Sequence, residues 1–440
     1  MHIMHQGFRL LALLVCVSAL APAPPDVSAF DVSWAASSPN PLADGMPLGN
    51  GAVVVLAWAN ITAGGIGFYV RHPHAQHTDS THFTLARVTV GLSPNPFSAS
   101  AYFNQTHHLE DGSVTVLAGG AGFSAPAAAL RIYVDANSDT VVVEATAGEG
   151  APPFSLSVAV ESVRPTAGNY TQPFYCFLST YRADVAGALD LGAPPGAVYI
   201  RHDNSVAAGD PDLWAFSVAQ QGLAPALPAP LPASPLDGRV FGVGAFGGAG
   251  GDGGGAPLVR NAAGTVLASA APAPAFLLHL CVRVSAEAPP QWEAGLAAQM
   301  AAAAAVAPAA RRAASNAWWA AFWSRSWVVP GGANGSALVA GQYARTRFIQ
   351  AAQSRGVAVP IKFNGMLYTN AGGARGPLDV DYRDWGPDNW RVGTRRGASP
   401  PPRPFITPPH THTHTHTHEQ VAKHTPALCK CRREPPLRAQ

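Results

Sequence analysis

The sequence predicts a mainly β protein in which a large antiparallel β-sandwich is followed by helices. From Asp31 to about Ala286, short runs of strand-forming residues alternate with turn residues at the spacing typical of sandwiches. Glycine and proline are abundant, at 44 and 41 of 440 residues, and this composition favours loops and short strands over long helices. Beyond residue 288 the apolar residues follow a helical period instead.

The N-terminal residues have the pattern of a secretory signal peptide, which we expect to span residues 1–29. A weakly basic start precedes an apolar run from Leu10 to Leu20, and small residues suited to cleavage end at Ala19 and Ala29. The run is too short to span a bilayer comfortably. We therefore expect a secreted, extracellular protein with no membrane association after the signal is removed.

The sandwich domain is expected over residues 30–288. A Pro-rich stretch, Leu223–Leu236, and a Gly-rich stretch, Gly247–Gly255, interrupt it. The Gly-rich stretch lacks the Lys-Ser/Thr of a phosphate-binding loop, so we interpret it as a surface loop rather than a nucleotide site. The expected strands are Ala52–Trp58, Phe68–Arg71, Ala86–Leu92, Val114–Leu117, Leu130–Val134, Thr140–Ala145, Phe154–Val163, Ala197–Arg201, Arg239–Phe246 and Ala275–Val284.

Two helices, Gln291–Val306 and Ala309–Trp327, are expected to form a helical linker over residues 289–329. Within the second helix Trp319, Trp323 and Trp327 recur every four residues, which places an aromatic stripe on one face. We expect this stripe to pack the helical region against the sandwich, and sugar binding by the stripe is the less favoured alternative.

A third helical pattern, running from Gln342, ends near Gly356 and Pro360, which are stop signals. The long loop that follows concentrates hydrogen-bonding groups, a charged pair and flat apolar faces, which suit a polyhydroxylated ligand. Alternatively, the same side chains only pin the loop to the body of the protein. The candidate substrate-binding residues are Lys362, Asn364, Asp381, Arg383, Trp385 and Trp390.

Three segments in the same order along the chain carry a family resemblance. They are Met46–Gly51 (MPLGNG), Ile132–Asn137 (IYVDAN) and the region Ser354–Trp390, which contains SRG, PIKFNG, DYR and WG. This pattern resembles the DUF5703 family of secreted glycosidase-like proteins, relatives of the glycoside hydrolase family 95 α-L-fucosidases. The resemblance implies that residues 330–392 begin an (α/α)6, or six-hairpin, catalytic barrel.

The resemblance also implies glycoside hydrolysis, which normally uses two carboxyl groups flanking the scissile bond. In the fucosidase relatives these groups lie deep in the barrel, and the matching positions would fall beyond the end of this chain. The family's Trp-Gln-Asn-Thr-Arg motif is altered as well, because Val392 or Gly393 stands where its water-positioning asparagine would be. We therefore expect no catalytic residue in the chain and interpret it as truncated or catalytically incomplete, with a glycan as its partner. The alternative is a non-catalytic carbohydrate-binding or structural module.

The Met46–Gly51 segment is expected to form a tight turn. Gly49 and Gly51 permit positive φ values on either side of Asn50, so the Asn50 amide can be aimed at a neighbouring group. In the relatives this loop lies near the interface between sandwich and barrel. We interpret it first as a structural hinge and second as a minor substrate contact.

The sequence contains glycosylation sequons and two cysteines at which an exported chain could be covalently modified. Four glycosylation sequons fit an exported protein. Cys176 and Cys281 either form a disulfide or remain a free, buried pair. The sequons begin at Asn60, Asn104, Asn169 and Asn334.

No metal, cofactor or nucleic acid is expected. The net charge of +2 gives no strong field that would attract nucleic acid. A histidine-rich stretch is interpreted as a surface turn rather than a zinc or copper site, although imidazoles beside a carboxylate are suitable ligands. Residues 393–440, rich in Arg and Pro and then in a His-Thr repeat, are predicted to be disordered. The histidine-rich stretch contains His72, His74, His77, Asp79 and His82.

Overall fold

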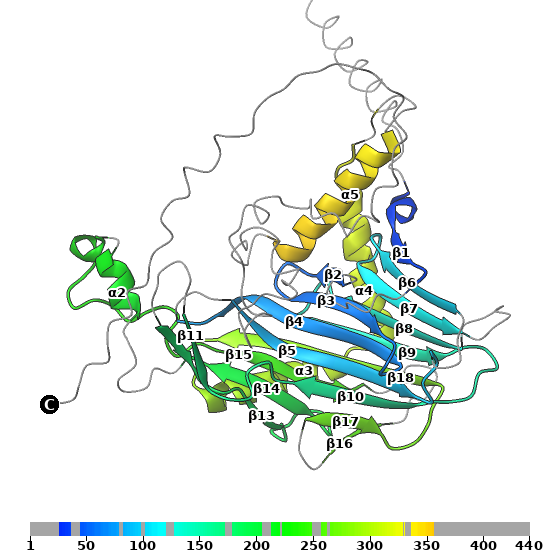
Figure 1. The fold of residues 1–440 in the computed structure, drawn as a ribbon, viewed down its shortest axis with the longest axis horizontal. Helices are drawn as coiled ribbons and strands as arrows, with labels where there is room; N and C mark the ends of the chain where they lie inside the picture. The colour runs from blue at the N-terminus through cyan, green and yellow to red at the C-terminus, as the bar shows by residue number, and fades with distance from the viewer. Residues whose placement is uncertain are drawn as a thin grey trace, which may run out of the picture.

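The computed structural model describes residues 26–36, 45–78, 82–97, 102–119, 127–171, 178–204, 213–220, 222–248, 257–261, 265–328, 330 and 336–355. Two antiparallel sheets lie one over the other as a sandwich, with helices on its outside (Figure 1). The predicted mainly β fold and antiparallel sandwich are therefore confirmed.

The larger sheet has nine strands and the smaller has seven. The larger contains β1 (Val32–Trp34), β6 (Tyr102–His108), β7 (Ser113–Gly119), β8 (Ala128–Val134), β9 (Thr140–Ala147), β18 (Ala275–Ser285), β15 (Val240–Gly247), β14 (Val198–Asp203) and β13 (Val185–Ala188), in that spatial order. The smaller contains β16 (Leu258–Arg260), β17 (Val266–Ser269), β10 (Ser155–Glu161), β5 (His82–Ser93), β4 (Gly65–Gln76), β3 (Val54–Asn60) and β2 (Met46–Gly49), in that order. A separate ribbon pairs β11 (Gly168–Thr171) with β12 (Leu178–Tyr181).

Apolar side chains fill the space between the sheets. Strand β10 shows the alternation that puts them there, since Leu156, Val158 and Val160 are buried whereas Ser157 and Glu161 are exposed. Full burial of a side chain of this size contributes about 1.5–3 kcal/mol. The inner faces of the two sheets are thus the main stabilising element of the fold.

The helix α3 (Pro289–Ala304) packs on the outer side of β15 and β18. Its buried Trp292, Leu296 and Met300 share an apolar cluster with Phe246 on the sheet. Gly244 makes this approach possible, because a Cβ there would lie 2.6 Å from Met300 Sδ. The nine-stranded sheet is therefore covered on both sides at its centre.

A second group of helices lies at the end of the sandwich that holds β1, β2 and β6 (Figure 1). It comprises α4 (Pro308–Trp323), α5 (Ser336–Gln353) and the short 3-10 helix η1 (Val27–Phe30). Val27 of η1 is buried in the same apolar cluster as residues of α4 and α5. The segment that begins at Asp26 is thus part of the packed structure.

The structure also contains elements that the sequence pattern did not single out. Helices α2 (Leu213–Gln220) and η2 (Ala224–Ala226) are among them, as are the strands β1, β2, β6, β11, β12, β13, β16 and β17. Most of these strands have four residues or fewer, and an alternation of that length is too short to distinguish from a loop.

The ends of two predicted elements need correction. Met46–Gly49 is an edge strand rather than part of a turn, and the turn begins only at Asn50. Helix α4 ends at Trp323, so the expected helix up to Trp327 is too long, although the Trp327 ring still stacks on Trp323 at 5.7 Å. Of residues 330–392, the structure describes α5 with its flanking residues, and the expected barrel otherwise falls outside the described residues. None of the described helices is both long enough and apolar enough to cross a membrane.

Candidate functional site

Asn50 lies at the centre of a polar junction between the sheets and the helices. Its Nδ2 donates to Asp135 O at 3.1 Å and to Ser138 O at 2.9 Å. Its Oδ1 accepts from Ala52 N at 3.0 Å and from Val53 N at 2.8 Å. The amide group therefore fixes its own turn and ties that turn to the loop after β8, 85 positions further along the chain.

The two glycines beside Asn50 serve different purposes. Gly51 has a φ of +87°, as expected, and its N donates to Ala352 O of α5 at 2.9 Å. Gly49, which also permits a positive φ, does not adopt one. Gly49 is required for space instead, since a Cβ there would lie 2.3 Å from Ala352 O. Helix α5 thus ends directly against the Asn50 turn.

Asp135, in the second motif, anchors α4 to the same junction. Its Oδ2 accepts from Arg311 Nη1 at 2.9 Å and from Ser138 Oγ at 2.7 Å, and its Oδ1 accepts from Asn137 N at 3.0 Å. The side chains of Asp135 and Arg311 are 6% and 4% exposed. Removing one partner of such a buried pair costs about 3–5 kcal/mol, because the other charge is left uncompensated.

Arg355 completes the junction at the C-terminal end of α5. Its guanidinium lies over the Trp318 ring, 3.4 Å from the centroid, and Nη1 donates to Ala136 O at 2.8 Å. Ala136 belongs to the second motif, and Arg355 belongs to the third. All three segments that carry the family resemblance therefore meet around Asn50.

The carboxyl groups of the junction are not arranged for acid–base chemistry. Asp135 is committed to Arg311. Burial raises the pKa of Asp139, and the hydrogen bond from Asn50 Nδ2, at 3.4 Å, opposes that shift. Glycoside hydrolysis needs two carboxyl groups about 5–9.5 Å apart with a sugar between them. Asn50 Nδ2 contacts the backbone oxygen of Asp135 and the carboxyl of Asp139, so the Asp139 carboxyl is also engaged within the fold.

The expected sugar-binding loop begins at this junction but is not itself described. Its first residues follow Arg355, whose position is fixed by the contacts above. Residues outside the described part of the chain, or described without their side chains, include Lys362, Asn364, Asp381, Arg383, Trp385, Trp390, Asn169, Asn334 and Cys176.

The tryptophan stripe of α4 packs the helices onto the sandwich. Trp319 stacks on Phe348 of α5 at 5.0 Å, and Trp323 Nε1 donates to Leu109 O at 2.8 Å. Trp319 and Trp323 are both buried. A buried ring offers no face to a ligand, so the packing interpretation agrees with the structure.

The histidine-rich stretch lies on β4 and β5 and does not gather around one point. Burial lowers the pKa of His72 to about 3, and His77 stacks on Phe83 at 5.0 Å. Asp79 lies outside the described residues. Among those described, no group of three or more His, Cys, Asp or Glu side chains is placed to hold a metal ion.

A buried charge network that the sequence does not predict surrounds Asp184. Asp184 Oδ1 accepts from Arg164 Nε at 3.1 Å and from His202 Nδ1 at 2.9 Å, while Oδ2 accepts from Ser162 Oγ at 2.6 Å. Burial lowers the pKa of His202 to about 4, although the hydrogen bond to Asp184 opposes it. The side chains of Arg164, Asp184 and His202 are all 2% exposed or less, so the network serves packing. No spacing in the sequence relates these residues, and only their burial reveals them.

Cys281 is a free thiol in the interior of the nine-stranded sheet. Burial raises its pKa to about 11, and its sulfur lies 3.8 Å from Thr140 Oγ1. A thiol in this state is a packing residue with little reactivity.

The fold and the junction together define a β-sandwich domain with α4 and α5 fixed at one end by a buried polar turn. The profile of a domain of unknown function, DUF5703 (its N-terminal part, DUF5703_N), matches residues 33–328, and the chain belongs to this family.

Among solved structures, 26 chains match this one. The chain is similar to a protein described as "Putative kojibiose phosphorylase from human microbiome", with 10% sequence identity and a TM-score of 0.44. The match covers 75% of this chain and 43% of that one, so the chain spans less than half the length of that protein. A likeness of this degree carries no conclusion about function. No match was found among curated proteins.

Proposed function

We propose that this chain is the sandwich-bearing part of a secreted, glycosidase-like protein, related to the α-L-fucosidases, and that its junction supports a catalytic barrel. In this proposal residues 30–288 are the sandwich, residues 289–329 are the helical linker and residues 330–392 begin the (α/α)6 domain. The observation that carries the proposal is the meeting of the three motif segments around Asn50.

The character of the junction supports a structural role for it. Its polar groups bond to one another: the Asn50 amide is fully engaged, Asp135 pairs with Arg311, and Arg355 is held between Trp318 and Ala136 O. Such a set of bonds fixes the direction in which the chain leaves α5. The loop with Lys362 and Trp385 starts from that fixed point, and precise placement of a ligand-binding loop requires a rigid support of this kind.

In this proposal the junction carboxyls are not the catalytic acid and base. A positioned general acid or base contributes about 10²–10⁴-fold to the rate, and the junction carboxyls are already bonded within the fold. We therefore propose that the 440-residue chain is catalytically incomplete and retains at most sugar binding. By resemblance, the complete protein would act on α-L-fucosides or related glycans with inversion.

An assay on two lengths of the protein tests this proposal. The secreted 440-residue chain is incubated with a panel of aryl glycosides that includes an α-L-fucoside, beside a form extended through an intact Trp-Gln-Asn-Thr-Arg motif and the rest of a barrel. We expect turnover only by the extended form. Turnover by the 440-residue chain that Asp381→Asn abolishes would refute the assignment. Inactivity of the extended form on every substrate, with glycan binding retained, would favour the non-catalytic binding module.

A further inference from the structure

Strand β6 displays a glycosylation sequon beside an exposed aromatic ring. Side chains alternate along the strand, so Gln105 and His107 are buried while Tyr102, Asn104 and Thr106 share the opposite face. Tyr102 and Asn104 are two positions apart, which separates their Cα atoms by about 6.6 Å along a strand. Tyr102 is 38% exposed, and its cross-strand partner is Gly119, which has no side chain.

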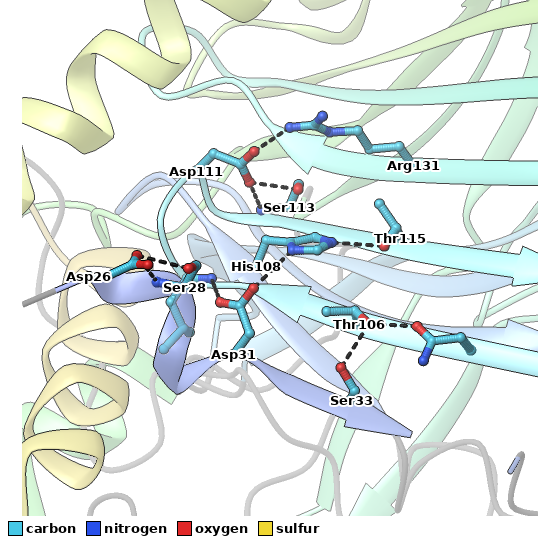
Figure 2. A network of polar contacts seen from close by, with 12 residues as sticks. Asp26, Ser28, Asp31, Ser33, Thr106, His108, Asp111, Ser113, Thr115 and Arg131 are labelled. Carbon is cyan, nitrogen blue, oxygen red and sulfur yellow. Dashed lines mark hydrogen bonds and ion pairs between the residues drawn. The ribbon is translucent and has the colours of Figure 1, made fainter. Parts of the chain in front are cut away.

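Hydrogen bonds hold the Asn104 amide in one orientation. Thr106 Oγ1 donates to Asn104 Oδ1 at 2.6 Å, and because its single proton is used there, Ser33 Oγ is the donor in the 2.8 Å contact with Thr106 Oγ1. Figure 2 shows Thr106 and Ser33 in a row of polar residues on this face of the sheet. Within the described part of the chain, Asn104 Nδ2 has no hydrogen-bond partner, and it is not among the buried polar atoms that lack one. The nitrogen that would carry a glycan is therefore directed to solvent.

We propose that Asn104 is N-glycosylated and that the first sugar of its glycan packs against the ring of Tyr102. This inference rests on the export proposed above. The donor is a lipid diphosphate-linked oligosaccharide: the sugar C1–O bond to the diphosphate breaks, a C1–Nδ2 bond forms, and the amide nitrogen loses one proton. The apolar C–H face of a pyranose then covers aromatic surface that is otherwise exposed to water.

The sequon at Asn60 supplies an internal comparison. It also has an aromatic residue two positions before the asparagine, Trp58, so the two sequons look alike in sequence. Trp58 is only 3% exposed, and its ring centroid lies 5.2 Å from that of Tyr69. The ring also lies directly over Gly67, where an added Cβ would be 2.7 Å from it. A glycan on Asn60 thus has no open ring to pack against, and only the glycan on Asn104 is expected to stabilise the fold.

The test measures occupancy and thermal stability in protein secreted from eukaryotic cells with an added secretion leader. Peptide mass spectrometry before and after enzymatic glycan removal reports occupancy at Asn104 and Asn60. Asn104→Gln is expected to lower the melting temperature by about 1–3 °C, the shift typical of a modest packing interaction in a protein of this size. Thr62→Ala removes the Asn60 sequon but keeps the bond from Ala63 N to Asn60 Oδ1, so this matched control is expected to leave it unchanged. In a Tyr102→Ala background, Asn104→Gln is expected to have a smaller effect, limited to the loss of the bond from Thr106 Oγ1.

Two results would overturn the inference. One is an unmodified Asn104 in a preparation whose Asn60 is glycosylated. The other is an equal fall in melting temperature on Asn104→Gln with and without the Tyr102 ring. Because the added leader enforces export, either result leaves the proposal of natural secretion standing. That proposal is tested separately, by asking whether the native N-terminus alone directs export.

Discussion

Asn50→Ala measures how strongly the fold depends on its polar junction. The substitution deletes the bonds from Nδ2 to Asp135 O and Ser138 O, and those to Oδ1 from Ala52 N and Val53 N. Each such bond contributes about 0.5–1.5 kcal/mol net, and a buried group left without a partner costs about 1–3 kcal/mol. Two of the four bonds are fully buried, so water can replace part of the remainder. We expect the free energy of unfolding to fall by about 3–4 kcal/mol.

Chemical denaturation is the appropriate assay. The midpoint should fall while the slope of the transition stays constant, which identifies a change in stability rather than in the denatured state. Asn137→Ala is the matched control, because Asn137 is exposed in the loop that receives the Asn50 amide. This control should stay within about 0.5 kcal/mol of the wild type. A loss below about 1 kcal/mol for Asn50→Ala would refute the reasoning.

Asn50→Asp separates the two halves of the amide. The acceptor for Ala52 N and Val53 N is kept, whereas the donor is replaced by an oxygen that faces Asp135 O and the Asp139 carboxyl. Burial near these oxygens should raise the pKa of the new carboxyl in the folded state above its unfolded value. Its stability contribution is then present below the unfolded pKa and is lost as pH rises through the folded pKa. The variant should therefore approach wild-type stability only at acidic pH.

Three further outcomes are expected. Gly49→Ala should destabilise the protein by about 1–3 kcal/mol through the clash with Ala352 O, whereas Gly187→Ala, with its nearest contact at 3.4 Å, should change little in the same denaturation assay. Asp139→Asn removes a carboxyl whose pKa is raised by burial. The stability contribution of the protonated Asp139 carboxyl is present at acid pH and is lost as pH rises. The melting temperature of Asp139→Asn, measured across pH, should therefore increase relative to that of the wild type toward neutral pH. Of the two candidate cleavage sites, Ala19 rather than Ala29 should end the signal peptide, because Val27 is buried and Asp26 accepts a hydrogen bond from Ser28 N; N-terminal sequencing that finds Phe30 first would contradict this revision of the expected 1–29 boundary.

Much of the sandwich could be predicted from the sequence because its strands repeat a local rule. The runs around Val158 and Val143 alternate or cluster apolar residues over enough positions to be recognised, and each predicted strand overlaps an observed one. The sequence of β2 predicts a turn instead of a strand, because Pro47 and Gly49 are poor strand formers in isolation. Its pairing with β3 and the cover provided by α5 decide its conformation, and neither is a local property.

The candidate site could be predicted only in part for the same reason. The sequence indicates that Asn50 occupies a turn with its amide directed at a neighbour, since this depends on the adjacent Gly51. That the neighbour is Asp135, and that Gly49 makes room for the end of α5, depends on tertiary packing between distant segments. The Asp184 network is an extreme case, because none of its members has a sequence neighbour that marks it as buried and charged.

The contact between Arg355 and Ala136 spans 219 positions, and this separation bears on how the protein is synthesised. At about 5–20 residues per second, roughly 10–45 s pass between the emergence of Ala136 and that of Arg355 from the ribosome. During this interval the apolar cluster that includes Val54 and Leu109 lacks the residues of α5 that cover it. The nascent sandwich therefore leaves this apolar surface exposed until α5 has been made, and we expect chaperones to bind it during that interval.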